Sequence, residues 1–209
     1  KDRTDAAGAF SIQLLPDEHC LGLSSVWRLV SDWRDRPLTQ DQALRAAGLV
    51  ARRFLRRNQT EWRAYNLHAT ATPWPVTGAR VKALFLPSST NETWSHPQWT
   101  SGWPDPTTAM DAVMERLGLT PQDVVMRCHP NWAERIGRQD GHRPERHYSD
   151  WARSRGIHVI GSHESTSTMH LIEQSDLLLL QSGSAALEAG LLGKPVVSTA
   201  PSIYHLGGF

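Results

Sequence analysis

The sequence predicts an α/β protein: a Rossmann-like parallel sheet with helices on both faces, preceded by a partly helical segment. Three observations support this class. After about residue 80, short β-rich runs alternate with helical patterns, as they do in parallel sheets. The run Leu177–Leu180 consists of leucine alone, which is typical of a strand buried on both faces. Before this series, alanine, leucine and arginine recur at helical spacing over Gln40–Tyr65.

The segment Gln40–Tyr65 is predicted to be an amphipathic helix that begins at Thr39 or Asp41. Its polar face could meet an anionic lipid surface or acceptor, or could simply be solvated, which is the commoner role of such a face. That face carries Arg45, Arg52, Arg56 and Arg63. The aperiodic, proline-containing run at 68–77 then indicates a connector. We therefore expect an N-terminal segment over 1–79 and a nucleotide-binding domain over 80–209.

The alternation in the second half gives a definite series of elements. The expected strands are Val81–Leu86, Val124–Cys128, Ile157–Ile160, Leu177–Leu180 and Pro195–Thr199. The expected helices are Thr107–Leu117, His147–Arg155, Met169–Gln174 and Ala185–Leu192. The polar, charged residues 137–147 are expected to form a loop over the sheet.

The net charge and the cysteine content indicate which classes of partner and which cellular compartment to expect. The formal net charge is +1, so the chain lacks the overall basic field on which non-specific nucleic-acid binding relies. Cys20 and Cys128 fit neither a disulfide framework nor a metal-binding spacing, and we expect ordinary buried thiols. Without a long apolar run or a signal-like start, the sequence predicts a cytoplasmic protein, with peripheral contact to the inner face of the inner membrane left open.

The strongest candidate site follows the leucine strand. In parallel sheets, ligands bind beyond the carboxyl ends of the strands. Here Gln181-Ser-Gly-Ser184 turns into a helix whose free N–H groups and dipole favour a phosphate. Gly183 allows close approach of the backbone, Ser182 and Ser184 supply hydroxyls, and Glu188 is placed to accept hydrogen bonds from a ribose.

A simpler interpretation of this turn is that Ser184 only caps the helix while Glu188 is solvated. The full seventeen-residue segment, Gln181 to Val197, favours the other interpretation. In it Gly193-Lys-Pro195 ends the helix and starts a further strand, as expected of a strand, turn, helix and strand unit. We therefore predict a nucleotide or nucleotide-sugar site.

Three other strand ends carry polar residues. Ser88 and Ser89 follow the first predicted strand, and His163 lies in the Gly161–Glu164 segment after the third. After the second strand, His129 is held extended by Pro130 and could protonate or hydrogen-bond a leaving phosphate, to which Arg127 could add charge. A structural role for His129 is the alternative.

No metal is expected in this sequence. The histidine pairs His158 and His163, and His142 and His147, are each five residues apart, and neither pair has the spacing of a zinc motif. We therefore predict a site that works without a metal or other cofactor.

These motifs resemble those of the bacterial capsular polysaccharide synthesis family, which includes the β-Kdo transferases of the capsule lipid linker and has GT-B architecture. The resemblance covers roughly residues 53 to 209. It comprises Arg63-Ala-Tyr-Asn66, similar to the family's Lys-Tyr-Asn element, and His129-Pro130, similar to its His-Pro motif. It also comprises Ser184-Ala-Ala-Leu-Glu-Ala189, similar to Ser-x-x-Gly-Phe-Glu-Ala, and the ending Tyr204-His-Leu-Gly-Gly208.

The resemblance implies the donor-binding, C-terminal half of a GT-B glycosyltransferase acting in capsule or other surface polysaccharide synthesis. It implies a CMP-activated sugar such as CMP-Kdo, with Ser184 and His129 on the cytidylate phosphate and Glu188 near the ribose. The acceptor would be a glycan or glycolipid. A nucleotide-sugar epimerase or hydrolase, or a non-catalytic nucleotide-binding fragment, is the alternative.

The sequence also departs from the family pattern. Its acidic Glu-Asp-Gly-Phe element, which supplies the catalytic acid or base, is not found in residues 1 to 40. Ala186 and Leu187 replace the Gly-Phe pair, and the acid of its Gly-Asp element has no equivalent in Ser88–Thr90. A GT-B enzyme needs two such domains, so 209 residues could be part of a longer enzyme.

Overall fold

The computed structural model describes residues 2–3, 10–11, 22–55, 69–88, 97–133 and 141–206. The chain divides into two compact units, Lys1–Leu67 and His68–Phe209. Among the sequence features singled out above, Ser89, Cys20, Arg56, Arg63 and the Tyr65-Asn66 pair lie outside the described residues. Within the described part, no helix has both the length and the apolar composition that a membrane span needs.

The first unit contains two helices and a short antiparallel pair of strands. Its elements are β1 (Asp2–Arg3), β2 (Phe10–Ser11), α1 (Leu23–Trp33) and α2 (Gln40–Phe54). The predicted start of the amphipathic helix is confirmed, because the Thr39 side chain accepts from the Gln42 N–H while the Gln42 side chain accepts from the Thr39 N–H. This reciprocal pair satisfies two N–H groups that a helix start otherwise leaves unbonded.

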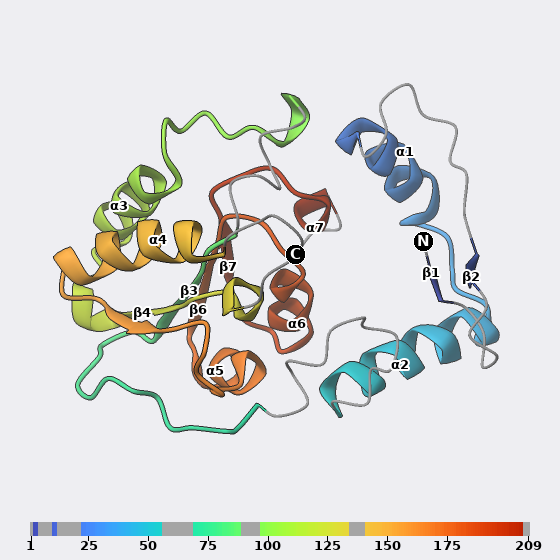
Figure 1. The fold of residues 1–209 in the computed structure, drawn as a ribbon. Helices are drawn as coiled ribbons and strands as arrows, with labels where there is room; N and C mark the ends of the chain where they lie inside the picture. Colours follow the sequence, from blue (N-terminus) through green and yellow to red (C-terminus); the bar gives the residue numbers. More distant parts are fainter. Residues whose placement is uncertain are drawn as a thin grey trace. The chain divides into compact units, whose positions relative to one another are not determined.

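The second unit is built on a five-stranded, fully parallel sheet (Figure 1). Its strands are β3 (Ala83–Leu86), β4 (Val124–Arg127), β5 (His158–Ile160), β6 (Leu177–Leu180) and β7 (Val196–Ser198). Their order is β5-β4-β3-β6-β7, so β3 is central and the chain winds first to one side of it and then to the other. This is the order of a Rossmann-like α/β fold, and it confirms the predicted fold class.

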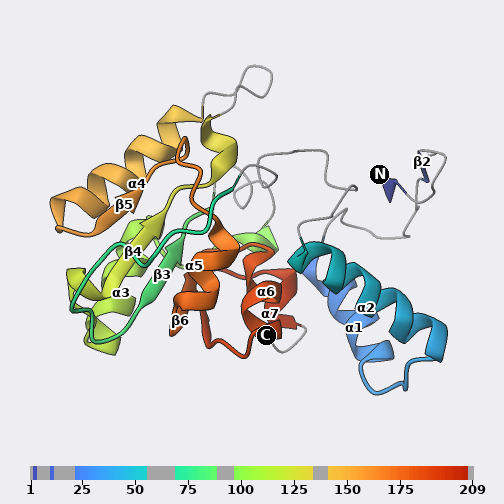
Figure 2. The ribbon, with the colours of Figure 1, turned by 90° about the horizontal axis from the view of Figure 1, so that it is seen from below.

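Helices cover both faces of this sheet, as the alternating pattern predicts (Figure 2). The α-helices of this unit are α3 (Pro106–Leu117), α4 (His142–Ser154), α5 (Thr168–Gln174), α6 (Ala185–Leu191) and α7 (Ile203–Leu206). Short 3-10 helices lie at η2 (Pro97–Trp99), η3 (Pro121–Asp123) and η4 (Pro130–Ala133). Helices α3 and α4 supply Met110 and Trp151 to the core on one face, and α5 and α6 supply Leu171 and Ala189 to the core on the other.

Strand β6 consists of leucine alone because it packs against the core on both faces of the sheet. Leu179 packs into the core beneath α3 and α4, whereas Leu178 and Leu180 pack into the core beneath α5 and α6. Side chains of a strand alternate between faces, so a strand covered on both faces must be apolar throughout. The uniform run in the sequence therefore marks an interior strand.

Residues 69–77, from the segment expected to be a connector, are part of the second unit and pack against its core. Trp74 is buried at 8% exposure in the core under α5 and α6. The Trp74 N–H donates to Gln174 Oε1 at 2.8 Å, and Thr70 pairs with the strand-like residue Thr166. The lack of a sequence period reflects a chain that runs irregularly across the surface of the domain while still burying an aromatic anchor.

Helix α4 begins at His142, five residues before the predicted start at His147. Its apolar face is carried by Tyr148, Trp151 and Ala152, which are buried and spaced as one face of a helix. The start of α4 at 142–147 carries Pro144 among otherwise polar and charged side chains, and none of these residues is buried. Those residues therefore show no apolar period, although 142–147 belong to the helix rather than to the predicted loop.

Candidate functional site

The position of the site follows from the strand order, which extends from β3 first towards β5 and then, on the other side of β3, towards β7. Strand β3 pairs with β4 on one side and with β6 on the other, and the connections after β3 and β6 diverge. In open parallel sheets, a crevice opens at the carboxyl ends of the two strands at this point, and ligands bind there. The residues that follow β3 and β6 are therefore the first candidates.

Ser88 and the Ser182–Gly183 turn meet at this crevice. Leu86 pairs with Leu180 in the sheet, so Ser88 and Ser182 each lie two residues past the same level. The Ser88 hydroxyl donates to the Ser182 carbonyl oxygen at 2.5 Å, and the Ser182 hydroxyl lies 3.4 Å from Ser88 Oγ. The structure thus brings together two predicted site residues that are distant in the sequence.

The Tyr148 side chain, from α4, contacts the residues that follow β3 and β6. Its side chain is fully buried and stacks on Trp132 with ring centroids 5.7 Å apart. Its hydroxyl oxygen lies 3.0 Å from the Ser88 carbonyl oxygen and 2.7 Å from Gln181 Oε1. The phenol therefore links Gln181, directly after β6, to Ser88, two residues after β3, and it fixes the floor of the crevice.

We expect Tyr148→Phe to lower the free energy of unfolding by about 1–2 kcal/mol, because the change removes the hydroxyl and leaves Gln181 Oε1 buried. Urea denaturation of the purified chain measures this loss. Tyr204→Phe is the control within the same unit, because Tyr204 is only partly buried at the edge of a pocket and phenylalanine keeps the ring that packs against the core, so it should change stability by less than about 0.5 kcal/mol. Equal losses in the two variants would contradict the linking role of Tyr148.

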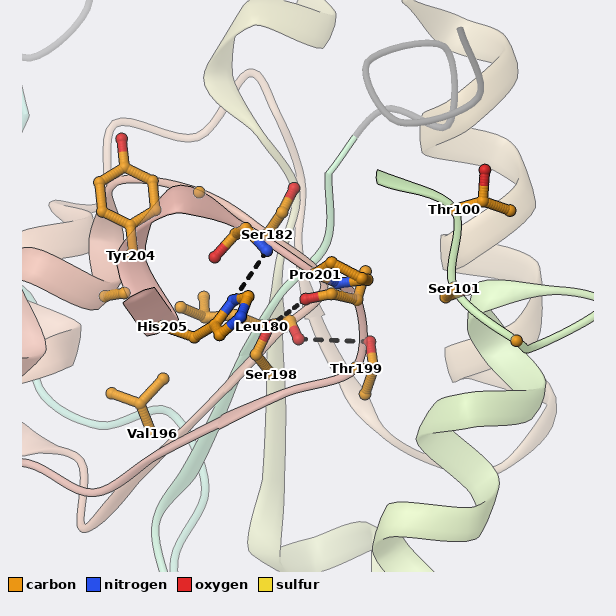
Figure 3. A pocket seen from close by; sticks show the side chains of 15 residues that line it. Thr100, Ser101, Leu180, Ser182, Val196, Ser198, Thr199, Pro201, Tyr204 and His205 are labelled. Atoms are coloured by element: carbon orange, nitrogen blue, oxygen red, sulfur yellow. Dashed lines mark hydrogen bonds between the residues drawn. The ribbon is translucent and has the colours of Figure 1, made fainter. Parts of the chain in front are cut away.

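A pocket of about 550 Å³ adjoins the crevice at the carboxyl ends of β6 and β7 (Figure 3). This volume is in the range of small-molecule sites. Tyr204 and His205 lie on one side of it and Thr100 and Ser101 on the other, with the strand-end residues between them. Its remaining lining residues are Gly102, Leu180, Ser182, Gly183, Ala186, Val196, Ser198, Thr199, Ala200, Pro201 and Ser202.

The pocket contains residues that the sequence analysis did not select. Ser198 ends β7 opposite Leu180, and Thr199 and Ser202 follow it, so these hydroxyls lie at the same carboxyl edge of the sheet as Ser182. The strand-end rule applied to the last predicted strand would have found this hydroxyl-rich run. Thr100 and Ser101 carry no such signal, because they come from an irregular segment far from any strand end.

Two histidines at the carboxyl edge are held in a defined orientation. Nδ1 of His205 accepts from the Ser202 N–H at 3.0 Å, and Nδ1 of His129 accepts from the Asn131 N–H at 3.1 Å. A neutral imidazole that accepts at Nδ1 carries its proton at Nε2. Each ring can therefore donate a hydrogen bond from Nε2, and His205 is one of the residues that line the pocket.

The position of His129 follows from the strand register. Phe85 pairs with Met126, and Ser88 and His129 each lie three residues past this pair. Both thus follow neighbouring strands on the same edge of the sheet, where the sequence predicted them. His129 is not among the residues that line the pocket, so its contact with a leaving phosphate stays a prediction.

The Arg127 side chain donates hydrogen bonds to backbone carbonyl groups and not to the crevice. It is 3% exposed, and its guanidinium donates to the carbonyl oxygens of Cys128, Gly161 and Glu164. Burial lowers the pKa of Arg127, while the nearby groups Cys128, Glu164 and Glu145 act in the opposite direction. We expected this charged group to contact a phosphate, but its hydrogen bonds to Gly161 and Glu164 hold the loop after β5 instead. Those bonds would have to break before Arg127 could reach a nucleotide.

Cys128 is a buried thiol, as the sequence predicts. Burial raises its pKa to about 11, so the thiolate that reacts with electrophiles or metals is scarce at neutral pH. Its sulfur lies 3.6 Å from the Ser149 hydroxyl oxygen. Cys128 therefore contributes packing rather than chemistry.

Ser184 and Glu188 belong to α6, which begins at the turn. The Ser184 side chain makes no capping hydrogen bond to its own helix, so capping alone does not account for it. Glu188 is 6% exposed and is therefore not solvated. Neither residue lines the pocket, and their contacts with phosphate and ribose stay predictions.

No protein-family model matches the sequence, and no curated protein matches it. Among solved structures, the chain is similar to Thermosulfurimonas dismutans KpsC, described as a beta Kdo 2,4 transferase, with a TM-score of 0.44 and 14% sequence identity. The similarity covers 86% of this chain and 50% of that one, so the chain spans about half the length of that structure.

Proposed function

We propose that the second unit binds a nucleotide sugar and forms the donor half of a glycosyltransferase that builds a surface polysaccharide. The observation that carries this proposal is the pocket of about 550 Å³ at the carboxyl ends of β6 and β7, next to the crevice between β3 and β6. A nucleotide bound there would lie against the Ser182–Gly183 turn. Tyr204 offers an aromatic ring and Ser198, Thr199 and Ser202 offer hydroxyls to its base and sugar.

The charge of the pocket favours a donor with one phosphate. Among its lining residues, none is a lysine, arginine, aspartate or glutamate. A CMP-sugar carries one negative charge on its single phosphodiester, whereas a nucleoside diphosphate sugar carries two. Neutral hydroxyl and N–H donors can balance one charge more readily than two. This supports the CMP-linked donor that the sequence motifs imply.

The chemistry required of this half is departure of the nucleotide. Transfer breaks the bond between the anomeric carbon and the phosphate oxygen, and the acceptor hydroxyl forms the new bond as it loses its proton. Donors already aimed at the phosphate stabilise the charge that develops on it. We assign this role to the Ser182–Gly183 turn and to the Nε2 protons of His205 and His129, with no metal involved. The acceptor, a glycan or glycolipid, and the base that deprotonates it belong to the other half of the site.

A thermal-shift comparison of CMP, UDP and GDP on the purified chain tests the donor class. CMP present at about 100 times its dissociation constant should raise the melting temperature by roughly 5–10 °C, because a ligand that binds only the folded state stabilises it. UDP and GDP should give smaller shifts. A shift with UDP or GDP that exceeds the shift with CMP would contradict the single-phosphate donor.

Variants of the histidines test the chemical roles. His205→Ala should weaken CMP binding about tenfold, the loss of one hydrogen bond to a charged group. His170→Ala is the matched control, because His170 lies on α5 and pairs with Glu173 at 3.1 Å, outside the pocket. In a two-domain enzyme that contains this chain, unchanged transfer by His129→Ala and Glu188→Ala together would contradict the proposed site.

A further inference from the structure

Three metal-binding side chains meet beyond the carboxyl ends of β4 and β5, on the side of the sheet away from β6 and β7. His142, Glu145 and His163 each offer a ligand atom, and these atoms all lie within 4.8 Å of one another. The two imidazole rings are 6.3 Å apart between centroids and inclined by 29°. His142 and His163 are far apart in the sequence and belong to different ones of the two histidine pairs noted by their spacing, so only the fold brings them together.

The fold brings these residues from two elements to one place. His142 and Glu145 are three residues apart at the start of α4, a spacing that places both on the same face of a helix. His163 comes from the turn that follows β5. Both histidines are exposed and Glu145 is partly buried, so an ion from solvent can reach the cluster directly.

Glu145 is already held in place. Its Oε1 accepts from the Ser162 N–H at 2.8 Å, and its Oε2 accepts from the Ser162 hydroxyl at 2.7 Å. Each carboxylate oxygen keeps a further lone pair for a cation. Hydrogen bonds of this kind orient the ligands of metal sites, and residues that provide them strengthen metal binding. Ser162 precedes His163, so the same turn supplies a ligand and orients another.

The donor set selects the class of ion. Two imidazoles and one carboxylate suit zinc and similar divalent transition metals, whereas magnesium and calcium prefer oxygen ligands alone. Bonds of about 2.0–2.1 Å in tetrahedral geometry place ligand atoms roughly 3.3 Å apart. Small rotations of the two exposed histidine side chains bring atoms that lie within 4.8 Å to that spacing.

From this arrangement we propose that His142, Glu145 and His163 bind one zinc-like divalent ion, which ties the start of α4 to the turn after β5. The site has a structural role. Strand β5 is separated from β6 by β4 and β3, and three strand spacings amount to about 14 Å, so the ion would lie too far away to contact a phosphate held at the Ser182 turn. The proposal thus stands independently of the glycosyltransferase assignment and of its metal-free chemistry.

Zinc binding to the tag-free chain, measured by competition with a chromophoric zinc chelator, tests the proposal. The wild-type chain should bind one zinc ion, and His142→Ala, His163→Ala and Glu145→Gln should each weaken binding at least about tenfold. Glu145→Gln keeps the shape of the side chain, so a loss in this variant reports on the ligand charge rather than on folding. Ser162→Ala should cause a smaller loss, since it removes only an orienting hydrogen bond.

His147→Ala is the matched control. His147 lies on the same helix and pairs with Asp105 at 3.1 Å, outside the cluster, so this variant should bind zinc as the wild type does. Zinc should also raise the melting temperature of the wild type and of His147→Ala but not that of His163→Ala. Failure of the wild type to bind zinc, or equal affinity in wild type and His163→Ala, would overturn the proposal.

Discussion

Replacement of Asp123 by asparagine is expected to lower the free energy of unfolding by about 3 kcal/mol at pH 7. Asp123 is 1% exposed and lies at the end of η3, directly before β4. Its carboxylate accepts from the N–H groups of Thr120, Arg80 and Val81 and from the Thr120 hydroxyl. An asparagine amide nitrogen cannot accept any of these bonds, so the variant buries donors without partners.

The Arg80 guanidinium also reaches this carboxylate, at 3.2 Å, but it is largely exposed and adds less. The Asp123 carboxylate thus organises the entry to both β3 and β4. It joins residues 80 and 81 to the 3-10 turn at 120–123, which sets the two strands side by side.

The loss in Asp123→Asn should depend on pH. Hydrogen bonds to the carboxylate, from the Thr120 N–H above all, hold the pKa of Asp123 far below its usual value. A depressed pKa contributes stability that is fully present above the unfolded-state value of about 3.9 and disappears as the pH falls towards the folded-state value. The difference between wild type and variant should therefore be full at pH 7 and pH 5 and smaller at pH 3, as measured by urea denaturation.

Asp176→Asn is the control for this experiment. Asp176 precedes β6 and is exposed, and its carboxylate accepts the Lys82 N–H at 2.9 Å. Loss of one exposed acceptor should cost at most about 1 kcal/mol. Equal losses in the two variants, or a loss in Asp123→Asn that is as large at pH 3 as at pH 7, would contradict the role assigned to the buried carboxylate.

The fold could be predicted from the sequence because its strands are interior. Leu177–Leu180 and the first three residues of β4, 124–126, are covered on both faces, so packing favours apolar side chains and each strand appears as an apolar run. The helices between them bury one face each and show a helical period. Helix α1 and the first turn of α4 were missed, since α1 leaves Trp27 and Trp33 exposed and the start of α4 buries little.

The site could be predicted only as far as the strand order allowed. Ser182 and Gly183 follow a recognisable strand, and the pairing of β3 with β6 explains why Ser88 lies beside them. The pairing of β3 with β6 depends on the tertiary structure and cannot be read from the spacing of residues along the sequence. The same holds for His163, which meets His142 only through the packing of α4 against the turn after β5, and for Thr100, which reaches the pocket from an irregular segment.

Substitution of Gly183 by alanine is expected to weaken CMP binding at least tenfold. Gly183 has a φ of +137°, a backbone conformation that side chains rarely adopt. An added Cβ would lie 3.8 Å from Ser88 Oγ, an ordinary contact, so the cost is backbone strain of about 1–3 kcal/mol rather than a clash. The turn can relieve that strain only by rotating its peptide groups, which would move the N–H groups proposed to hold the phosphate.

Gly156→Ala separates binding from stability. Gly156 has a φ of +74°, and an added Cβ would meet nothing within 4 Å, so this variant also incurs backbone strain, of about 1–2 kcal/mol. Gly156 precedes β5 and therefore lies at the amino ends of the strands, away from the pocket. Isothermal titration with CMP should show an unchanged dissociation constant for Gly156→Ala and at least a tenfold increase for Gly183→Ala, while both lose stability in urea. If Gly183→Ala lost stability but bound CMP as the wild type does, the turn would serve only to end β6, and the nucleotide would have to bind elsewhere in the chain.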